Sequence, residues 1–263
     1  MPGLPHVSKE MDLDAFRRLF SDPDFRPDML KIYTCMVFKG TKLYEMWQKG
    51  EYKPLTTQEA AEMIVEFKKI VPEYVRIMRV VRDIPTQMSE DGVRKTNLRQ
   101  DIFQLMHERG ITCKCIRCRE IGRTNKPVPD YSIRVLKYAA SQGTEFFIEA
   151  QYEGILLGYC RLRFPSQSLR EEITETSAII RELHVYGKKE DIGQKGITGT
   201  STQHVGIGKK LMQAAELICK DHGKDKVLVI SAIGTRKYYE KLGYVLEGPY
   251  MVKLFGEKAK III

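Results

Sequence analysis

Short apolar runs alternate with helical patterns over the first 80 residues of the chain. The run Met-Leu-Lys-Ile-Tyr-Thr-Cys-Met-Val-Phe at 29–38 is rich in β-branched and aromatic residues, which predicts a buried strand. Thr56 followed three residues later by Glu59 matches a capping box, and apolar residues at helical spacing come after it. This segment therefore has α/β periodicity. Its further predicted elements are helices over 14–20 and 42–49 and a strand over 74–81.

The second half of the chain has a longer and more regular α/β pattern. A polar-faced helix is predicted over 97–108, before the pattern resumes near residue 130. The predicted strands that follow are 146–150, 155–162, 177–186, 227–231 and 244–247, and the predicted helices are 206–221 and 235–242.

A Lys-Pro-Val-Pro stretch at 126–129 is typical of a linker and marks the main boundary. We therefore expect three parts: a partial α/β barrel over 1–82, a basic linker with cysteines over 83–125, and an α/β domain over 126–263.

Composition excludes several classes. Of the 263 residues, 43% are hydrophobic and 29% charged, which is ordinary for a globular protein. No apolar run approaches the ~18–20 residues of a membrane-spanning helix, so no membrane partner is expected. Six cysteines do not form a disulfide pattern here, since three of them crowd into residues 113–118. A reducing, cytoplasmic location is expected.

Charge favours anionic partners. Lys and Arg number 43 against 34 Asp and Glu, a net charge of +9, and the excess is concentrated between residues 76 and 123. Arginine suits phosphate recognition because its planar group can form two parallel hydrogen bonds, although a solvated surface would have the same composition. The candidate RNA-binding residues are Arg76, Arg79, Arg82, Arg94, Lys95 and Arg99.

The most specific motif is Gln-His-Val-Gly-Ile-Gly-Lys-Lys at 203–210, between a predicted strand and a long helix. Gly206 and Gly208 would let a ligand approach the backbone closely. The free N–H groups and the dipole of the first helical turn favour an anion such as pyrophosphate. A glycine-rich helix start without a ligand is the alternative.

The order of strand, glycine loop, helix, strand and Tyr-Tyr-Glu-Lys-Leu-Gly-Tyr at 238–244 resembles the GNAT acyltransferase family. That family has a mixed, mostly antiparallel sheet with helices, and its glycine loop holds the pyrophosphate of acetyl-CoA. The resemblance implies that Tyr239, beside Tyr238, hydrogen-bonds the departing thiolate. The cofactor-binding residues that it implies are Leu183, His184, Val185, Gln203, His204, Val205, Gly206, Ile207, Gly208, Lys209, Tyr238 and Tyr239.

The resemblance extends to the Elongator catalytic-subunit family, which joins a radical S-adenosylmethionine barrel to a GNAT domain. The residues that carry it are 181–187, 203–208, 238–244 and 247–251, together with 30–33, 40–44, 76–85 and 113–120. This resemblance implies acetyl-CoA-dependent modification of wobble uridine 34 in tRNA. The partners that it implies are tRNA, acetyl-CoA, and other Elongator-type subunits or a second copy of the chain.

One feature of that family is absent from this sequence. The family's radical domain carries three closely spaced cysteines for a [4Fe–4S] cluster, whereas Cys35 stands alone before Cys113. The chain therefore resembles the C-terminal part of the family. Neither the cluster nor S-adenosylmethionine binding is expected for it.

Cys113, Cys115 and Cys118 supply three thiolates within six residues, which suits tetrahedral Zn²⁺. An iron–sulfur site is the alternative from the residues alone, while the resemblance implies a zinc-bearing linker. The candidates for a fourth ligand are His107, Cys35 and His6.

Two further residues are candidates for acid–base chemistry. His184 lies on a strand that borders the acyl group in GNAT folds, although a structural histidine is the favoured interpretation, and Glu182 lies two residues before it. Either could serve as base in a protein or small-molecule N-acetyltransferase, which is the alternative function. A non-enzymatic RNA-binding fragment is the second alternative.

Overall fold

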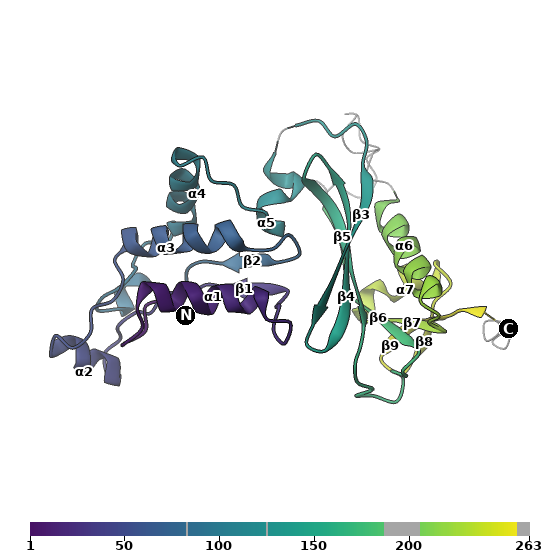
Figure 1. The fold of residues 1–263 in the computed structure, drawn as a ribbon, viewed down its shortest axis with the longest axis horizontal. Coiled ribbons are helices and arrows are strands. Elements are labelled where there is room, and N and C mark those ends of the chain that lie inside the picture. The colour runs from purple at the N-terminus through teal and green to yellow at the C-terminus, as the bar shows by residue number, and fades with distance from the viewer. Residues whose placement is uncertain (83, 125, 187–205, 257–263) are drawn as a thin grey trace. The chain divides into compact units, whose positions relative to one another are not determined.

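The computed structural model describes residues 1–82, 84–124, 126–186 and 206–256 (Figure 1). The chain divides into two compact units, Met1–Cys118 and Arg119–Ile263. Both units combine helices with strands, which confirms the expected α/β class. Among the described residues, no helix has the length and apolar composition needed to span a bilayer.

The first unit holds a two-stranded parallel sheet surrounded by helices. Strand β1 pairs with β2 from Met29 opposite Arg76 to Lys31 opposite Arg79. The elements in chain order are α1 (Lys9–Ser21), β1 (Met29–Lys31), α2 (Lys42–Gln48), α3 (Thr57–Ile70), β2 (Arg76–Arg79), the 3₁₀ turn η1 (Thr86–Met88), α4 (Leu98–Glu108) and α5 (Ile116–Arg119), in which the boundary between the units falls.

Helix α3 is the central helix of this unit and begins with the expected capping box. The Thr56 hydroxyl accepts a hydrogen bond from the Glu59 backbone N–H at 3.2 Å, and the Glu59 carboxylate accepts one from Thr56 N–H at 2.8 Å. Its apolar face is buried, and Phe67 stacks on Phe16 of α1 with ring centroids 4.1 Å apart. The capping box and the apolar spacing are both confirmed.

The strand predicted over 29–38 is wrong beyond Lys31. Its register with the short strand β2 already shifts between Leu30 and Lys31. The backbone N–H of Cys35 bonds instead to the carbonyl of Pro2, and Val37 forms an isolated bridge with Asp91. The run is apolar because it is buried, but loops rather than a third strand satisfy its backbone.

The second unit is built on a seven-stranded mixed sheet in the order β3-β4-β5-β6-β7-β9-β8. Among the described strands of this sheet, only β6 and β7 are parallel neighbours, which confirms the expected mixed, mostly antiparallel sheet. Its elements are η2 (Ile121–Arg123), β3 (Ser132–Ala140), β4 (Gly143–Tyr152), β5 (Ile155–Phe164), β6 (Ser177–Val185), α6 (Ile207–Asp221), β7 (Lys226–Val229), η4 (Ile233–Thr235), α7 (Arg236–Glu240), β8 (Val245–Glu247) and β9 (Tyr250–Leu254).

Helix α6 packs across β4, β5 and β6, as Figure 1 shows. Ile207, Leu211 and Ala215 on the helix are fully buried against residues of the sheet such as Ile148 and Cys160. The helix predicted over 206–221 is therefore confirmed, and it buries one apolar face.

The opposite face of the long strands carries buried ion pairs. Glu145 accepts a hydrogen bond from Arg163 at 2.7 Å and forms an ion pair with Arg181 at 2.9 Å. Glu149 pairs with Arg119 at 2.7 Å and also with Arg134. Alternation along the strands therefore places apolar side chains on one face and compensated charges on the other.

The structure predicts that Gly158 on β5 tolerates no side chain. A Cβ there would lie 2.8 Å from the His184 carbonyl oxygen and 3.2 Å from Val185 Cα. We expect Gly158→Ala to destabilise the protein by about 1–3 kcal/mol, because backbone atoms of β6 must move. Thermal unfolding measures the loss, with Gly122→Ala as control, since a Cβ on Gly122 meets nothing within 4 Å. Equal melting temperatures for both variants would contradict this account.

Candidate functional site

The parallel pairing of β6 with β7 in the second unit ends before β6 itself does. Their parallel pairing runs only from Ser177 opposite Lys226 to Ile180 opposite Val229. Strand β6 then continues to Val185 along β5, and its register with β5 skips Arg181. Such a bulge bends the strand and increases its twist. Diverging carboxyl ends of parallel strands are a common place for ligands in α/β folds.

The N-terminus of α6 is shaped by a glycine in a left-handed conformation. Gly206 is the N-cap residue with φ of 94°, and among the described residues a Cβ on it would meet no atom within 4 Å. Ile207 anchors the helix start in the core, while Lys209 is exposed. The N–H groups in the first turn of this 15-residue helix are the kind of donors that suit an anion. The other predicted loop residues, Gln203, His204 and Val205, lie outside the described residues.

Gly208, Val185 and Tyr238 come together at this helix start. A Cβ on Gly208 would lie 2.8 Å from the Tyr238 hydroxyl oxygen and 3.6 Å from Val185 Cγ2. Gly208 and two residues predicted from separate motifs thus lie close together at the end of β6.

The two predicted tyrosines occupy different environments. Tyr238 is 39% exposed, whereas Tyr239 is 7% exposed and belongs to the core. Their rings lie 5.2 Å apart at 78°. Burial raises the pKa of Tyr239 to about 12 and also raises the pKa of Tyr238. Both phenols therefore keep their protons at neutral pH and can donate hydrogen bonds.

Two polar residues that lie between β7 and Tyr238 in the chain were missed in the sequence analysis. The Ser231 hydroxyl, just after β7, and the Arg236 Nε, at the start of α7, are buried and have no hydrogen-bond partner in the described part of the chain. Buried polar atoms normally have partners, so these two are available to a ligand. The hydrophobic pattern of the sequence does not single out these two residues, although both flank the 3₁₀ turn η4 that precedes Tyr238.

Glu182 is held by two buried partners on β5. Its Oε1 accepts from the Tyr159 hydroxyl at 2.6 Å, and its Oε2 accepts from Arg161 Nε at 3.0 Å. Arg161 is 1% exposed, so Glu182 balances a buried positive charge. Taking up a proton would weaken that pair, which favours a positioning role over that of a base.

His184 lies on the same face of β6 and is exposed. Its ring stacks near Tyr159 with centroids 5.8 Å apart and lies 4.5 Å from the Tyr186 ring. Leu183 points to the other face and packs against the apolar core. The side chains of residues 182–185 therefore alternate between the two faces of β6.

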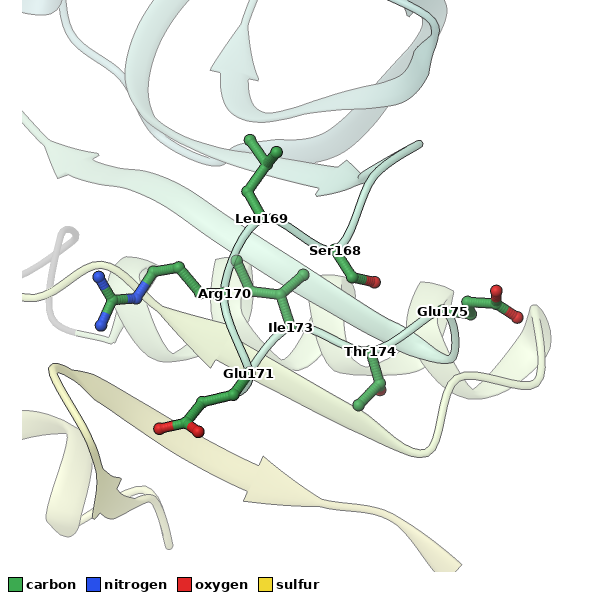
Figure 2. Close-up of a pocket in the computed structure, with 7 residues that line it drawn as sticks. All are labelled: Ser168, Leu169, Arg170, Glu171, Ile173, Thr174 and Glu175. Atoms are coloured by element: carbon green, nitrogen blue, oxygen red, sulfur yellow. The ribbon is translucent and has the colours of Figure 1, made fainter.

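A shallow depression follows β5 and has different chemistry. Ser168, Leu169, Arg170, Glu171, Ile173, Thr174 and Glu175 line it (Figure 2). Arg170 is paired with Glu172 at 3.2 Å and lies over the Tyr250 ring, while Glu175 points away from it in Figure 2. Its polar groups do not converge on one point, so it lacks the character of the site at α6.

The three neighbouring cysteines of the first unit form a compact group. Their Sγ atoms all lie within 4.8 Å of one another, and among the described residues the group includes neither His107, Cys35 nor His6. Hydrogen bonds from Cys113 and Cys118 hold the pKa of Cys115 far below its usual range. Lys68 Nζ donates to Cys118 Sγ at 3.2 Å. The group has the donors for a metal ion that prefers sulfur.

The predicted basic residues do not all face solvent. Arg79, Arg94 and Lys95 are exposed, whereas Arg99 donates to the Met78 carbonyl at 3.0 Å and so ties α4 to β2. Arg76 is half-buried. Arg82 lies over the Tyr33 ring and lines a small pocket together with Lys95.

Two known families match separate parts of the chain. The Radical_SAM C-terminal domain matches residues 27–108, and the Acetyltransferase (GNAT) domain matches residues 197–253. The second unit therefore contains a GNAT domain, which follows a radical-SAM C-terminal domain.

Individual relatives match nearly the whole chain. The tRNA uridine(34) acetyltransferase of Methanocaldococcus jannaschii is 45% identical over 96% of this chain and 48% of its own length. The human Elongator complex protein 3 is 40% identical over 97% of this chain and 48% of its own length. The structure of Methanocaldococcus infernus Elp3 with an N-terminal deletion superposes with a TM-score of 0.89 at 44% identity, covering 97% of this chain and 62% of that one.

The chain is therefore homologous to the tRNA uridine(34) acetyltransferases and Elongator complex protein 3, which confirms the expected resemblance. It spans about half the length of the curated relatives that it matches.

Proposed function

We propose that the chain takes part in acetyl-CoA-dependent modification of tRNA wobble uridine 34, by binding acetyl-CoA and cleaving its thioester in response to tRNA. The observation that carries this proposal is the meeting of Gly208, Val185 and the Tyr238 hydroxyl at the start of α6. The relatives named as tRNA uridine(34) acetyltransferases support the substrate.

The second unit offers a distinct role to each part of the proposed site. The N–H groups after Gly206 face the pyrophosphate, and the strand end 181–185 offers backbone groups to the pantetheine arm. Ser231 and Arg236 supply the buried donors that have no partner among the described residues. Tyr239 donates a hydrogen bond to the leaving sulfur, and Tyr238 borders the bound thioester.

Zinc is the proposed occupant of the cysteine group in the first unit. Tetrahedral Zn²⁺ with bonds of about 2.3 Å to sulfur places its sulfur ligands about 3.8 Å apart. The separations of up to 4.8 Å among these sulfurs are compatible with one ion. An iron–sulfur cluster distributes its cysteine ligands over separate irons and needs more widely spaced sulfurs. Neither a cluster nor S-adenosylmethionine is proposed for these 263 residues.

A basic surface of the first unit is proposed to bind the tRNA backbone. Arg79, Arg94 and Lys95 are exposed there, although Lys95 pairs with Asp101 at 2.7 Å. Contacts to phosphates need no base reading, which suits a surface of this kind. Free rather than bridged cysteines support the proposed cytoplasmic location.

An N-acetyltransferase acting on amines is less well supported. Such an enzyme would use Glu182 or His184 as base, yet both carboxylate oxygens of Glu182 are already engaged. The basic surface and the names of the relatives have no role in that alternative.

The test is acetyl-CoA consumption measured with tRNA, with a lysine peptide, and with neither. We expect tRNA alone to accelerate it, with tRNA affinity falling steeply as salt is raised because bound counterions are released. Acceleration by the peptide instead would establish the N-acetyltransferase, and tRNA binding without turnover would establish a non-enzymatic RNA-binding protein. Mass spectrometry of the treated tRNA should detect no carboxymethyluridine, because this chain lacks the cysteine triad of the radical domain.

Gly208→Glu should abolish the binding of acetyl-CoA while the fold is retained. The new side chain must displace the Tyr238 hydroxyl and brings negative charge to the phosphate position. We expect calorimetry to show affinity at least about tenfold weaker, equivalent to 1.4 kcal/mol. Gly122→Glu adds the same charge at an exposed position of the same unit and should bind normally. Unchanged affinity of Gly208→Glu would remove the phosphate-loop interpretation.

Tyr239→Phe should slow thioester cleavage about 10²-fold without weakening acetyl-CoA binding, because only the proton donor is lost. Tyr238→Phe should have the smaller effect on kcat. Because the pKa of Tyr239 is about 12, its neutral form persists and the wild-type rate should not lose this donor between pH 7 and pH 10. A full rate in Tyr239→Phe would rule it out as the donor.

The cysteine group should hold close to one equivalent of zinc per chain. Replacing Cys113, Cys115 or Cys118 by serine should lower the metal content and the melting temperature, since structural zinc contributes to folding. Cys35→Ser should leave the metal content unchanged, because Cys35 lies outside the group. Elemental analysis of protein purified without chelator decides it, and a metal-free wild type would refute the site.

A further inference from the structure

Lys68 is an unusually placed lysine. It lies in the last turn of α3 and is only 1% exposed, although lysine is almost never fully buried without a charged partner. No carboxylate of the described residues forms an ion pair with it. Its nitrogen instead donates to Cys118 Sγ at 3.2 Å and lies 5.2 Å from the centroid of the Phe103 ring.

The neighbouring residue shows that the helix end alone does not explain this burial. Lys69 lies in the same last turn and has the same helix dipole, yet its side chain is 41% exposed and pairs with Glu66 at 2.6 Å. A lysine that only neutralises the carboxyl end of α3 would stay in solvent as Lys69 does. Burial of Lys68 therefore requires a specific negative charge nearby, and the cysteine group is the one that the described structure provides.

The charges of the group and Lys68 balance when a divalent ion is bound. Three thiolates and one divalent cation leave a net charge of −1, which is costly to bury. The Lys68 ammonium brings the assembly to zero. Among the described residues no fourth His, Cys, Asp or Glu joins the group, so no further protein anion or ligand competes with Lys68 for this charge.

We propose that Lys68 is the built-in counter-charge of the cysteine site, which sets its affinity for a divalent ion without binding the metal itself. This inference rests on the metal part of the proposed function. It makes Lys68 a positioning residue for Cys118 and predicts that the fourth position on the ion is open to a small ligand.

The test compares zinc dissociation constants of Lys68→Met and Lys69→Met with the wild type, by competition with a chromophoric chelator. Methionine keeps the apolar stem beside Phe103 and removes the charge. We expect Lys68→Met to bind zinc about 10–100-fold more weakly, as for other partners of metal ligands, and Lys69→Met to bind as the wild type does. Equal constants for Lys68→Met and the wild type would overturn the proposal.

Cobalt substitution distinguishes a counter-charge from a ligand. The visible absorption bands of bound Co²⁺ should keep their positions in Lys68→Met, because the set of ligand atoms is unchanged. A shift of these bands would show that the lysine coordinates the metal, which contradicts the proposal.

A second variant tests the proposal if Lys68→Met does not fold. Lys68→Arg retains the positive charge and should bind zinc more tightly than Lys68→Met or Lys68→Gln. If zinc affinity falls equally in all folded variants, the effect comes from packing and the proposed role of the charge is overturned. If the wild type itself takes up no zinc, the metal proposal fails first, whereas zinc uptake that is insensitive to Lys68 overturns this inference alone.

Discussion

The proposed ligand contacts of the second unit depend on the point at which β6 and β7 stop pairing. A backbone ladder that continued past Ile180 and Val229 would consume the strand-end groups and close the space in front of α6. The bulge at Arg181 follows directly after that point, where it bends β6 and increases its twist. The absence of a side chain at Gly158 allows the bent strand to stay close, with the His184 carbonyl in the place that a Cβ would need.

In the proposed site, binding and chemistry would share the same few atoms. A Cβ on Gly208 would lie 2.8 Å from the Tyr238 hydroxyl oxygen, so the proposed phosphate end and the proposed thioester end meet at one tyrosine. Tyr239 gains its high pKa from the same core that anchors Ile207. The packed core beneath the proposed site therefore supports its polar side chains and holds their positions.

The sequence was most informative where a motif and its periodicity agree. The capping box at Thr56, helix α6 and the central strands of the sheet could be predicted, because each buries one regular face. Strand β3 was missed because it is an edge strand with polar residues on much of its length, and the run after Lys31 was misassigned because loops satisfy its backbone. Ser231, Arg236 and Lys68 could not be found from sequence, since their significance lies in buried atoms that come together only in the fold.

The charged face of the sheet also specifies how its strands align. On β4, Glu145 and Glu149 alternate with Phe146, Ile148 and Ala150, which pack toward α6. A slip of β4 by one residue would turn both carboxylates into that apolar layer. Their arginine partners would stay on the other face of the sheet without a counter-charge. Misaligned pairings are therefore penalised by unpaired buried charge, so these ion pairs contribute to the uniqueness of the register more than to the depth of the energy minimum.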